Sequence, residues 1–145
     1  MTAVGEPMPV TIEGHLFGRL PFYDVVDTDD TVIVDLHHRP DLVNTRGALQ
    51  GGLVATLIDI AGGRLVVKHA DVGAGVGTAD MSIHFVAPIV GGPARATATL
   101  VRAGKRLIVV AVDVVDVAKD RHAARATLSF AVMEPRGPGQ PATGP

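Results

Sequence analysis

The sequence contains no cysteine and no tryptophan, and only one tyrosine and four phenylalanines among its 145 residues. The absence of cysteine excludes disulfides, thiolate metal sites and a cysteine nucleophile. Charged residues make up 19% of the chain, the net charge is −2 and no basic run is present, so nucleic-acid binding is not expected. No segment is long enough to span a bilayer, and the N-terminus lacks a signal-peptide pattern. We therefore expect a cytoplasmic protein with no membrane partner.

Hydrophobic residues make up 47% of the chain, which is enough for the core of one domain and suggests further burial by oligomerisation. We expect this domain over residues 20–133. Residues 1–19 are an irregular lead-in, broken by glycine and proline, which lies across a partner subunit or is partly mobile. Residues 134–145 are rich in proline and glycine and are expected to be disordered.

The most informative stretch of the chain covers residues 44–68. It predicts a loop that tightens at the pair Gly51-Gly52 and then continues as one long helix from Leu53. Apolar residues surround nearly the whole helix, so we expect it to be buried. Asp59 is the one carboxylate within this apolar run. Its position is therefore the first candidate for a functional site.

Asp59 has two interpretations, because a buried carboxylate is costly without partners, whereas an ordinary aspartate simply faces solvent. The glycine pair favours function, since Gly51 and Gly52 leave the first helical amides open at the positive end of the helix dipole, where a carbonyl oxygen or an anion binds. An oxyanion donor and a carboxylate form half of an acyl-transfer site. Within one chain they are roughly 10 Å apart. We therefore predict a two-fold dimer in which Asp59 of one subunit faces Gly51 of the other.

The rest of the chain predicts antiparallel strands. Two β-branched runs, at residues 22–26 and 31–36, flank an aspartate-rich turn and indicate a hairpin. After the helix, a glycine-rich connector at 70–77 leads to an alternating run at 78–86. Three further runs joined by short turns indicate a meander, and they span residues 94–102, 106–117 and 122–132. A long apolar helix needs a curved sheet around it, so the expected fold class is α+β.

Several residues at characteristic spacings are shared with a known family. They are Asn44, Gln50-Gly51-Gly52, Asp59, Thr78-Ala79-Asp80-Met81 and Arg102-Ala103-Gly104-Lys105-Arg106. Over roughly residues 20–132 the chain resembles the hotdog-fold acyl-CoA thioesterases, and it is most similar to the phenylacetate-pathway (PaaI-like) type. The resemblance implies a hotdog fold, with a long central helix wrapped by a curved antiparallel β-sheet. It also implies a homodimer joined edge to edge through the two sheets, and pairing of dimers into a homotetramer.

The resemblance implies an acyl-CoA thioesterase that releases a free carboxylic acid and CoA, with no metal and no cofactor. The amide of Gly51 would polarise the thioester carbonyl, and Asp59 of the facing subunit would act as general base or nucleophile. Asn44 would position the water or the thioester, and Thr78 would hydrogen-bond the water. The family most often has His where this chain has Gln50, whose amide forms hydrogen bonds but does not titrate.

For the coenzyme, the resemblance places the CoA phosphates at a basic surface turn around Gly104; an ordinary solvated hairpin turn is the alternative. The low aromatic content indicates an acyl pocket of aliphatic side chains. The residues assigned to CoA and acyl binding are Gly52, Leu53, Leu57, Val86, Arg102, Gly104, Lys105 and Arg106.

Two other functions remain open from the sequence. The first is a non-catalytic acyl-CoA-binding hotdog module, which the replacement of His by Gln50 favours. The second is a hotdog hydratase or dehydratase, which typically pairs Asp with His. The absence of histidine from residues 39–68 disfavours that reaction.

Overall fold

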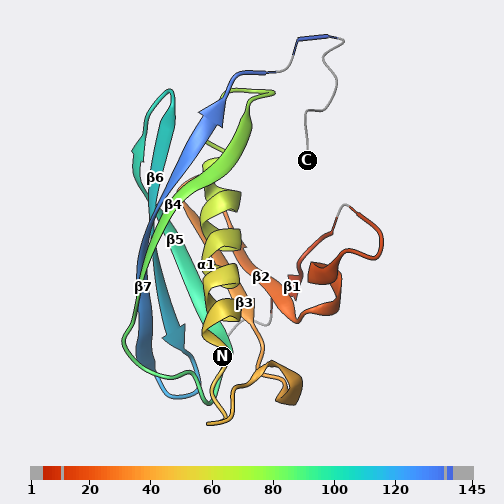
Figure 1. Cartoon of the computed structure of the whole chain (residues 1–145), viewed down its shortest axis with the longest axis vertical. Helices are drawn as coiled ribbons and strands as arrows, with labels where there is room; N and C mark the ends of the chain where they lie inside the picture. Colours follow the sequence, from red (N-terminus) through yellow and green to blue (C-terminus); the bar gives the residue numbers. More distant parts are fainter. Residues whose placement is uncertain (1–4, 11, 136, 139–145) are drawn as a thin grey trace.

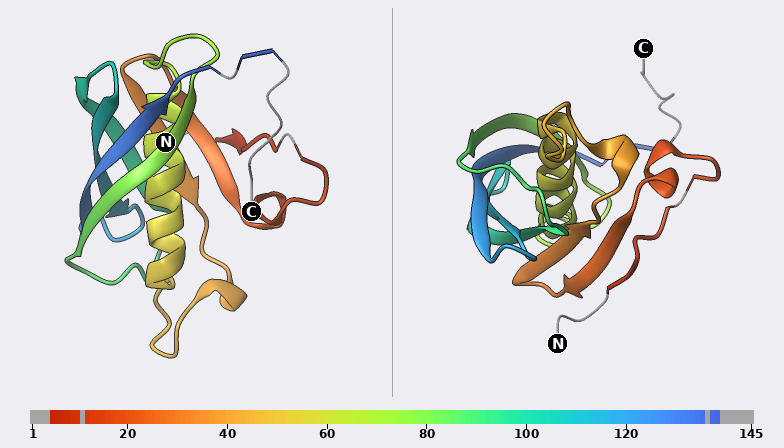
Figure 2. Two further views of the ribbon diagram at one scale, coloured as in Figure 1. Left: turned by 45° about the horizontal axis from the view of Figure 1, so that its top comes forward. Right: turned by 90° about the horizontal axis from the view of Figure 1, so that it is seen from below.

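The computed structural model describes residues 5–10, 12–135 and 137–138. Within these residues, one α-helix, α1 (Gly51–Val66), lies against a seven-stranded antiparallel sheet with the strand order β1-β2-β3-β5-β6-β7-β4. The strands are β1 (Glu6–Pro7), β2 (Phe22–Asp27), β3 (Thr31–Leu36), β4 (Gly75–Phe85), β5 (Ala94–Ala103), β6 (Leu107–Asp116) and β7 (Arg121–Met133). The sheet curves around the helix (Figures 1 and 2), which is the hotdog architecture expected from the sequence.

The core lies between α1 and the concave face of the sheet. β6 shows the pattern most clearly, because every second residue from Ile108 to Asp116 is buried and the residues between them are not. The helix contributes seven buried residues, Val54, Leu57, Ile58, Ala61, Gly62, Leu65 and Val66. Gly62 permits a close approach, since a Cβ there would lie 3.1 Å from a methyl group of Val110.

The predicted hairpin and meander are confirmed, with strand ends that differ by a few residues. β4 starts at Gly75, so the glycine-rich connector is shorter than predicted. β4 pairs with β7 and forms one edge of the sheet. The helix was predicted to follow the glycine pair, but it starts at Gly51, with Gln50 as its N-cap residue. Both glycines therefore belong to its first turn.

The prediction that α1 is buried on nearly all sides is wrong for the isolated chain. Residues such as Thr56, Asp59, Ile60 and Gly63 lie on a face that is only half-buried. The sheet closes around the opposite face, and its edge strands β1 and β4 do not meet over the helix (Figure 2). One face of the helix therefore stays accessible to a ligand or to a second subunit.

The N-terminal lead-in is more regular than the sequence indicated. It contains β1 and a short 3-10 helix, η1 (Leu16–Arg19), and it lies beside β2 at the open side of the barrel-like sheet (Figure 1). A second 3-10 helix, η2 (Pro40–Leu42), follows β3. The tail that was predicted to be disordered covers residues 134–145. Positions 136 and 139–145 of this tail lie outside the described residues, as do positions 1–4 and 11 of the lead-in.

The connection from β4 to β5 crosses one end of the sheet and is held there by a buried carboxylate. Asp116 is fully buried and accepts hydrogen bonds from the amides of Val90 (2.9 Å), Gly91 (3.0 Å) and Gly92 (2.8 Å). The carbonyl of Ile89 in turn accepts from the amide of Leu49, two residues before α1. This chain of contacts fixes the start of the helix relative to the sheet. Among the described residues, none of the helices is long and apolar enough to cross a membrane.

Candidate active site

At the middle of α1, the side chain of Asp59 is in direct contact with Thr78 of strand β4. The hydroxyl of Thr78 donates a hydrogen bond of 2.7 Å to Oδ1 of Asp59. The Asp59 side chain is half-buried on the accessible face of the helix, and Thr78 is exposed on the edge strand β4. The sequence placed both residues in one site but expected Thr78 to bind the water; in the folded chain it binds the carboxylate itself. Among the described residues, Oδ2 of Asp59 accepts no hydrogen bond, so this oxygen is not occupied by the contact.

A β-bulge positions Thr78. The pairing register between β4 and β7 shifts between Thr78, opposite Phe130, and Asp80, opposite Ser129. Ala79 is therefore an extra residue in β4. A bulge locally changes the direction in which side chains leave a strand, and this one lies next to the residue that contacts Asp59.

The start of α1 presents open amides. Gln50 makes no side-chain hydrogen bond as the N-cap. In the described part of the chain, the backbone amides of Gly51 and Gly52 have no hydrogen-bond acceptor, whereas Leu53 and Val54 already donate to the carbonyl of Gln50. The ring of Phe85 lies beside this end, 3.9 Å from where a Gly51 Cβ would be. Open amides at the start of a helix are donors that can bind a carbonyl oxygen or an anion.

Asn44 shapes the loop that precedes the helix. Its Oδ1 accepts hydrogen bonds from the amides of Arg46 (2.9 Å) and Ala48 (3.2 Å), and its own amide donates to the carbonyl of Ala48 (2.7 Å). Gly47 completes the turn with φ of +78°, a conformation that favours glycine. Asn44 is therefore a loop-forming residue, and its side-chain NH2 is the part left for a ligand.

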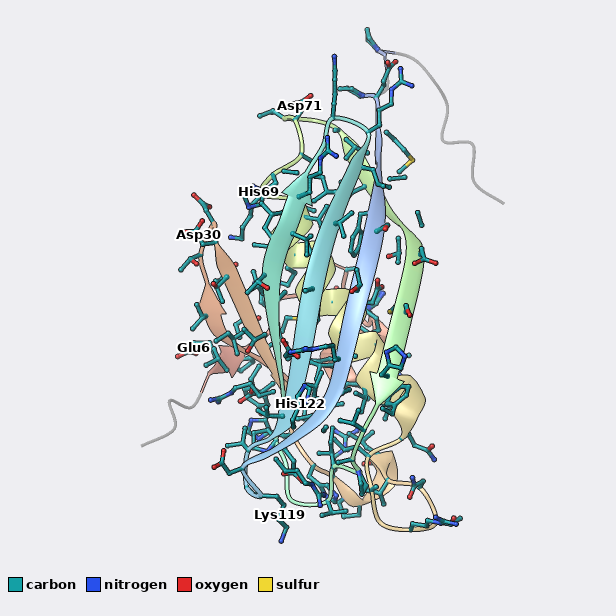
Figure 3. All side chains as sticks on the ribbon, turned by 90° about the vertical axis from the view of Figure 1, so that its left-hand side faces the viewer. Glu6, Asp30, His69, Asp71, Lys119 and His122 are labelled. Atoms are coloured by element: carbon teal, nitrogen blue, oxygen red, sulfur yellow. The ribbon has the colours of Figure 1, made fainter. Side chains whose placement is uncertain are left out.

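The basic turn lies at the other end of the molecule. Gly104 and Lys105 line a depression of about 310 Å³ together with His69 and Asp71, which follow the end of α1 (Figure 3). Arg106 lines a neighbouring depression with Glu134. Gly104 is required for close approach, since a Cβ there would lie 2.6 Å from a backbone oxygen of Leu107. The acidic residues Asp71 and Glu134 thus lie close to Lys105 and Arg106, which the sequence of the turn did not predict.

The candidate residues form three groups along the helix. Asn44, Gln50, Gly51, Gly52, Leu53 and Val86 lie near its start, Asp59 and Thr78 at its middle, and Arg102 to Arg106 near its end. α1 has 16 residues, which corresponds to about 24 Å. Gly51 and Asp59, eight positions apart, are about 12 Å apart along the axis. A single chain therefore does not bring the oxyanion donor, the carboxylate and the basic turn together.

The predicted acyl pocket is partly wrong. Leu57 is fully buried in the core and cannot line a pocket. Leu53 is half-buried and Val86 is exposed, and neither is among the residues that line the groove and depressions described in this section.

Sequence analysis missed a groove of about 440 Å³ between α1 and the lead-in, which we call the N-terminal groove. The lead-in contributes Met8, Pro9, Val10, Ile12, His15 and Phe17, and the helix contributes Asp59, Ile60, Gly63 and Arg64. Asp59 thus lies between Thr78 on one side and this groove on the other. The apolar residues between positions 8 and 17 were the available signal, but no local pattern shows which surface they cover.

Ion pairs connect the last turn of α1 and the residues just after it to β2. Arg64 contacts Asp24 and donates to Oδ2 of Asp27 at 3.0 Å, and Lys68 lies 2.8 Å from Oδ1 of Asp27. Partial burial lowers the pKa of the Arg64 guanidinium. Two cations and two carboxylates compensate each other here. Within the described ranges, no group of three or more His, Asp or Glu side chains is placed to hold a metal ion.

Comparison with known proteins decides the family. The model of the thioesterase superfamily matches residues 46–120, which is more than half of the chain and includes α1 and both Asp59 and Thr78. The chain belongs to the thioesterase superfamily. Its enzyme class is accordingly that of the thioester hydrolases. Among curated proteins, none matches this chain.

Solved structures of several other proteins share the fold. A thioesterase from Haemophilus influenzae superposes with a TM-score of 0.79 at 16% identity, covering 88% of this chain and 89% of that one. A Bacillus halodurans protein crystallised with CoA is 35% identical, with a TM-score of 0.66 over 70% of this chain and 66% of that one. The PaaI protein of the Escherichia coli phenylacetic acid degradation operon is 18% identical, with a TM-score of 0.72 over 81% and 83%.

Proposed function

We propose that this thioesterase-superfamily chain is an acyl-CoA thioesterase, which hydrolyses an acyl-CoA thioester to a free carboxylic acid and CoA. The observation that carries the proposal is the accessible carboxylate of Asp59, oriented by Thr78, on a helix whose first amides are open. The likeness to a Bacillus halodurans protein crystallised with CoA supports the coenzyme. The PaaI-like type and a homotetramer are proposed on the resemblance alone.

In the proposed reaction, the carbonyl oxygen of the thioester accepts a hydrogen bond from the Gly51 amide, which stabilises the negative charge that develops on it. Asp59 takes a proton from water while the water oxygen attacks the carbonyl carbon. The carbon–sulfur bond then breaks, and the CoA thiolate takes the proton from Asp59. Attack by Asp59 itself, followed by hydrolysis of the anhydride, is the nucleophilic variant. Neither route needs a metal or a cofactor.

The remaining residues have supporting roles in this proposal. Thr78 orients Asp59 by occupying Oδ1, so that Oδ2 faces the water. Asn44 holds the loop before the helix and offers its NH2 to the thioester or the water. Gln50 is exposed beside Gly51, and in this proposal its side-chain amide binds the substrate.

A homodimer would complete the site. β4 is an edge strand, and edge strands offer unpaired backbone groups to a second sheet. Exposed apolar side chains, Met81, Phe85 and Val86, lie along or just after it. If two copies join edge to edge with antiparallel helices, the start of one helix lies beside the middle of the other. Gly51 of one subunit then faces Asp59 of its partner, and the basic turn of Lys105 and Arg106 lies further along the same helix.

The experiment that tests the function measures CoA release with a thiol reagent across short, medium, long and aryl acyl-CoAs. The chain has no cysteine, so it contributes no thiol background. Asp59→Asn is expected to lower kcat by about 100-fold or more, because it removes the base. Asp30→Asn, in the exposed turn between β2 and β3, is the matched control and is expected to have no effect. An Asp59→Asn enzyme with unchanged turnover would remove Asp59 from the mechanism.

Gly51→Pro tests the oxyanion donor without moving the helix. Proline removes the amide hydrogen, yet it suits the first position of a helix. Gln50 has φ of −56° and ψ of 131°, a conformation compatible with a following proline. We expect a fall in kcat of about 100-fold, as for other lost oxyanion donors, with an unchanged melting temperature.

A second candidate function is a non-catalytic acyl-CoA-binding module, which Gln50 in place of the usual His favours. It predicts no CoA release from any substrate, while acyl-CoAs still raise the melting temperature of the protein. The same panel therefore separates the two functions.

A further inference from the structure

The N-terminal groove has an apolar wall made by the lead-in. Met8, Val10, Ile12 and Phe17 line it from this side, and the side chains of Val10 and Ile12 are 43% and 64% exposed. Exposed apolar side chains gathered in one concave place mark a binding site more often than a free surface.

The wall is fixed at both ends. The amide of Met8 donates to the carbonyl of Phe22 at 3.0 Å, next to the pairing of β1 with β2. At the other end, Phe17 packs edge-on against Phe22 with 5.8 Å between ring centroids. Nδ1 of His15 accepts from the amide of Phe17 at 3.1 Å and shapes the turn between them. The described residues 8–10 and 12–17 are therefore held in place beside the helix.

The charges around the groove favour an uncharged occupant. Arg64 reaches the groove, but its guanidinium is compensated by Asp24 and Asp27. Asp59 is the other charged residue in the lining, and it would repel a carboxylate. An apolar group with a reactive carbonyl at the Asp59 end fits both features.

From this geometry we propose that the N-terminal groove binds the acyl group of the substrate, and that Val10 and Ile12 make the enzyme select apolar acyl chains longer than acetyl. This inference rests on the proposed thioesterase function, since Asp59 belongs to both the groove and the catalytic site. The volume of about 440 Å³ lies within the range of small-molecule pockets. The acyl chain enters past Asp59 and lies between Ile60 of the helix and Ile12 of the lead-in.

The test compares Ile12→Ser with Leu16→Ser. Both residues are exposed and apolar and lie four positions apart in the lead-in, at 64% and 59% exposure, but only Ile12 lines the groove. Binding of two non-hydrolysable thioethers, S-octyl-CoA and S-ethyl-CoA, is measured by calorimetry on the full chain. The ratio of kcat/KM for octanoyl-CoA over acetyl-CoA is measured in parallel.

We expect the wild type to prefer the octyl ligand. Ile12→Ser should reduce this preference about 5-fold in both binding and kcat/KM. The substitution removes apolar contact with the octyl chain of the ligand but leaves the contacts with its CoA part unchanged. Leu16→Ser should stay within about 2-fold of the wild type, as expected for a surface substitution away from the site. Binding of S-ethyl-CoA should be the same in all three proteins.

The outcomes distinguish failure of the groove inference from failure of the proposed thioesterase function. If the wild type hydrolyses acyl-CoAs but the octyl preference is the same in all three proteins, the groove does not bind the acyl group and another occupant, such as a partner subunit, covers it. If Ile12→Ser changes the octyl preference in binding while no acyl-CoA is hydrolysed, the groove inference holds and the thioesterase proposal fails.

Discussion

At the level of single residues, the contact between Thr78 and Asp59 determines which carboxylate oxygen a substrate meets. The hydroxyl takes Oδ1 at 2.7 Å, and hydrogen bonds to charged groups are short and strong. The contact also fixes the rotation of the Asp59 carboxylate on a helix face that is open to a ligand. Thr78 is thus a positioning residue, acting through Asp59.

Thr78→Val should therefore lower kcat about 10- to 100-fold, because a lost hydrogen bond to a charged group corresponds to about 1.5 to 3 kcal/mol. Thr78→Ser keeps the hydroxyl and is expected to retain most of the activity. Both variants should unfold at the wild-type temperature, since position 78 is exposed. Steady-state kinetics check this prediction, and equal losses in the two variants would contradict it.

The residue types of the site could be predicted from the sequence, but their contacts could not. The glycine pair and the lone carboxylate of the apolar helix identified Gly51 and Asp59 by local spacing. The hydrogen bond of Thr78 to Asp59 depends on a bulge at Ala79, which follows from pairing with β7 more than forty residues later. The N-terminal groove was missed for the same reason, since Val10 and Ile12 lie beside a helix face that begins at Asp59, almost fifty positions later in the chain.

At the level of elements, α1 lies close to β6 and β7 because of one of its glycines, Gly62. A Cβ at Gly62 would lie 3.1 Å from Val110 and 3.4 Å from Phe130, whereas a Cβ at Gly63 would be in ordinary contact with Phe130 at 3.6 Å. Gly62→Leu is expected to destabilise the fold by about 1 to 3 kcal/mol through overpacking. Gly63→Ala should be neutral or stabilise it by up to about 1 kcal/mol, since alanine is the better helix former. Denaturant unfolding of the two variants checks this pair.

The sequence predicted the helix, the hairpin and the meander because their hydrophobic periodicities are local. It placed the start of α1 after Gly52 because glycine is a poor helix former, and the structure shows the helix starting at Gly51. The reason lies outside the helix. Gln50 and Leu49 are held by hydrogen bonds to Leu42 and Ile89, and Asp116 holds the segment that follows Ile89.

Asp116 should make the fold sensitive to acid. Burial by itself raises the pKa of this carboxyl, but hydrogen bonds from the amides of Gly91, Val90, Gly92 and Lys119 outweigh burial and lower the pKa below its usual range. The folded state therefore binds this proton less readily than the unfolded state. The stabilisation is complete above about pH 4, the unfolded pKa of aspartate, and is lost as the pH falls below it.

Asp116→Asn is expected to lower the free energy of unfolding at pH 7 by about 1 to 3 kcal/mol, because buried amide donors lose a charged acceptor. The wild-type curve of stability against pH should fall more steeply below pH 4 than the curve of the variant. Chemical denaturation across pH 3 to 7 measures both. Parallel curves would show that another carboxyl causes the acid sensitivity.

At the level of the whole molecule, the three groups of site residues lie along one helix and do not converge within a chain. The open amide of Gly51 is at one end of α1 and Asp59 is at its middle. The turn of Lys105 and Arg106 is near the other end, where His69 and Asp71 follow the helix (Figure 3). An antiparallel second copy would bring the three groups together. The start of its helix would lie beside Asp59 of the first copy, on the side of Asp59 that faces the basic turn of the first copy. Each active site would then use the carboxylate of one subunit and the amide of the other.

Mixing two inactive variants tests this arrangement. Asp59→Asn and Gly51→Pro chains are each expected to be inactive, but a heterodimer contains one site in which Asp59 and Gly51 are both intact. After subunit exchange at equal amounts, about half of the dimers are heterodimers with one of two sites complete, so about a quarter of the wild-type activity should return. A chain that carries both substitutions should restore nothing when it is mixed with either single variant. If the single variants also stay inactive together while native mass spectrometry shows heterodimers, Asp59 and Gly51 do not act on one substrate across the interface.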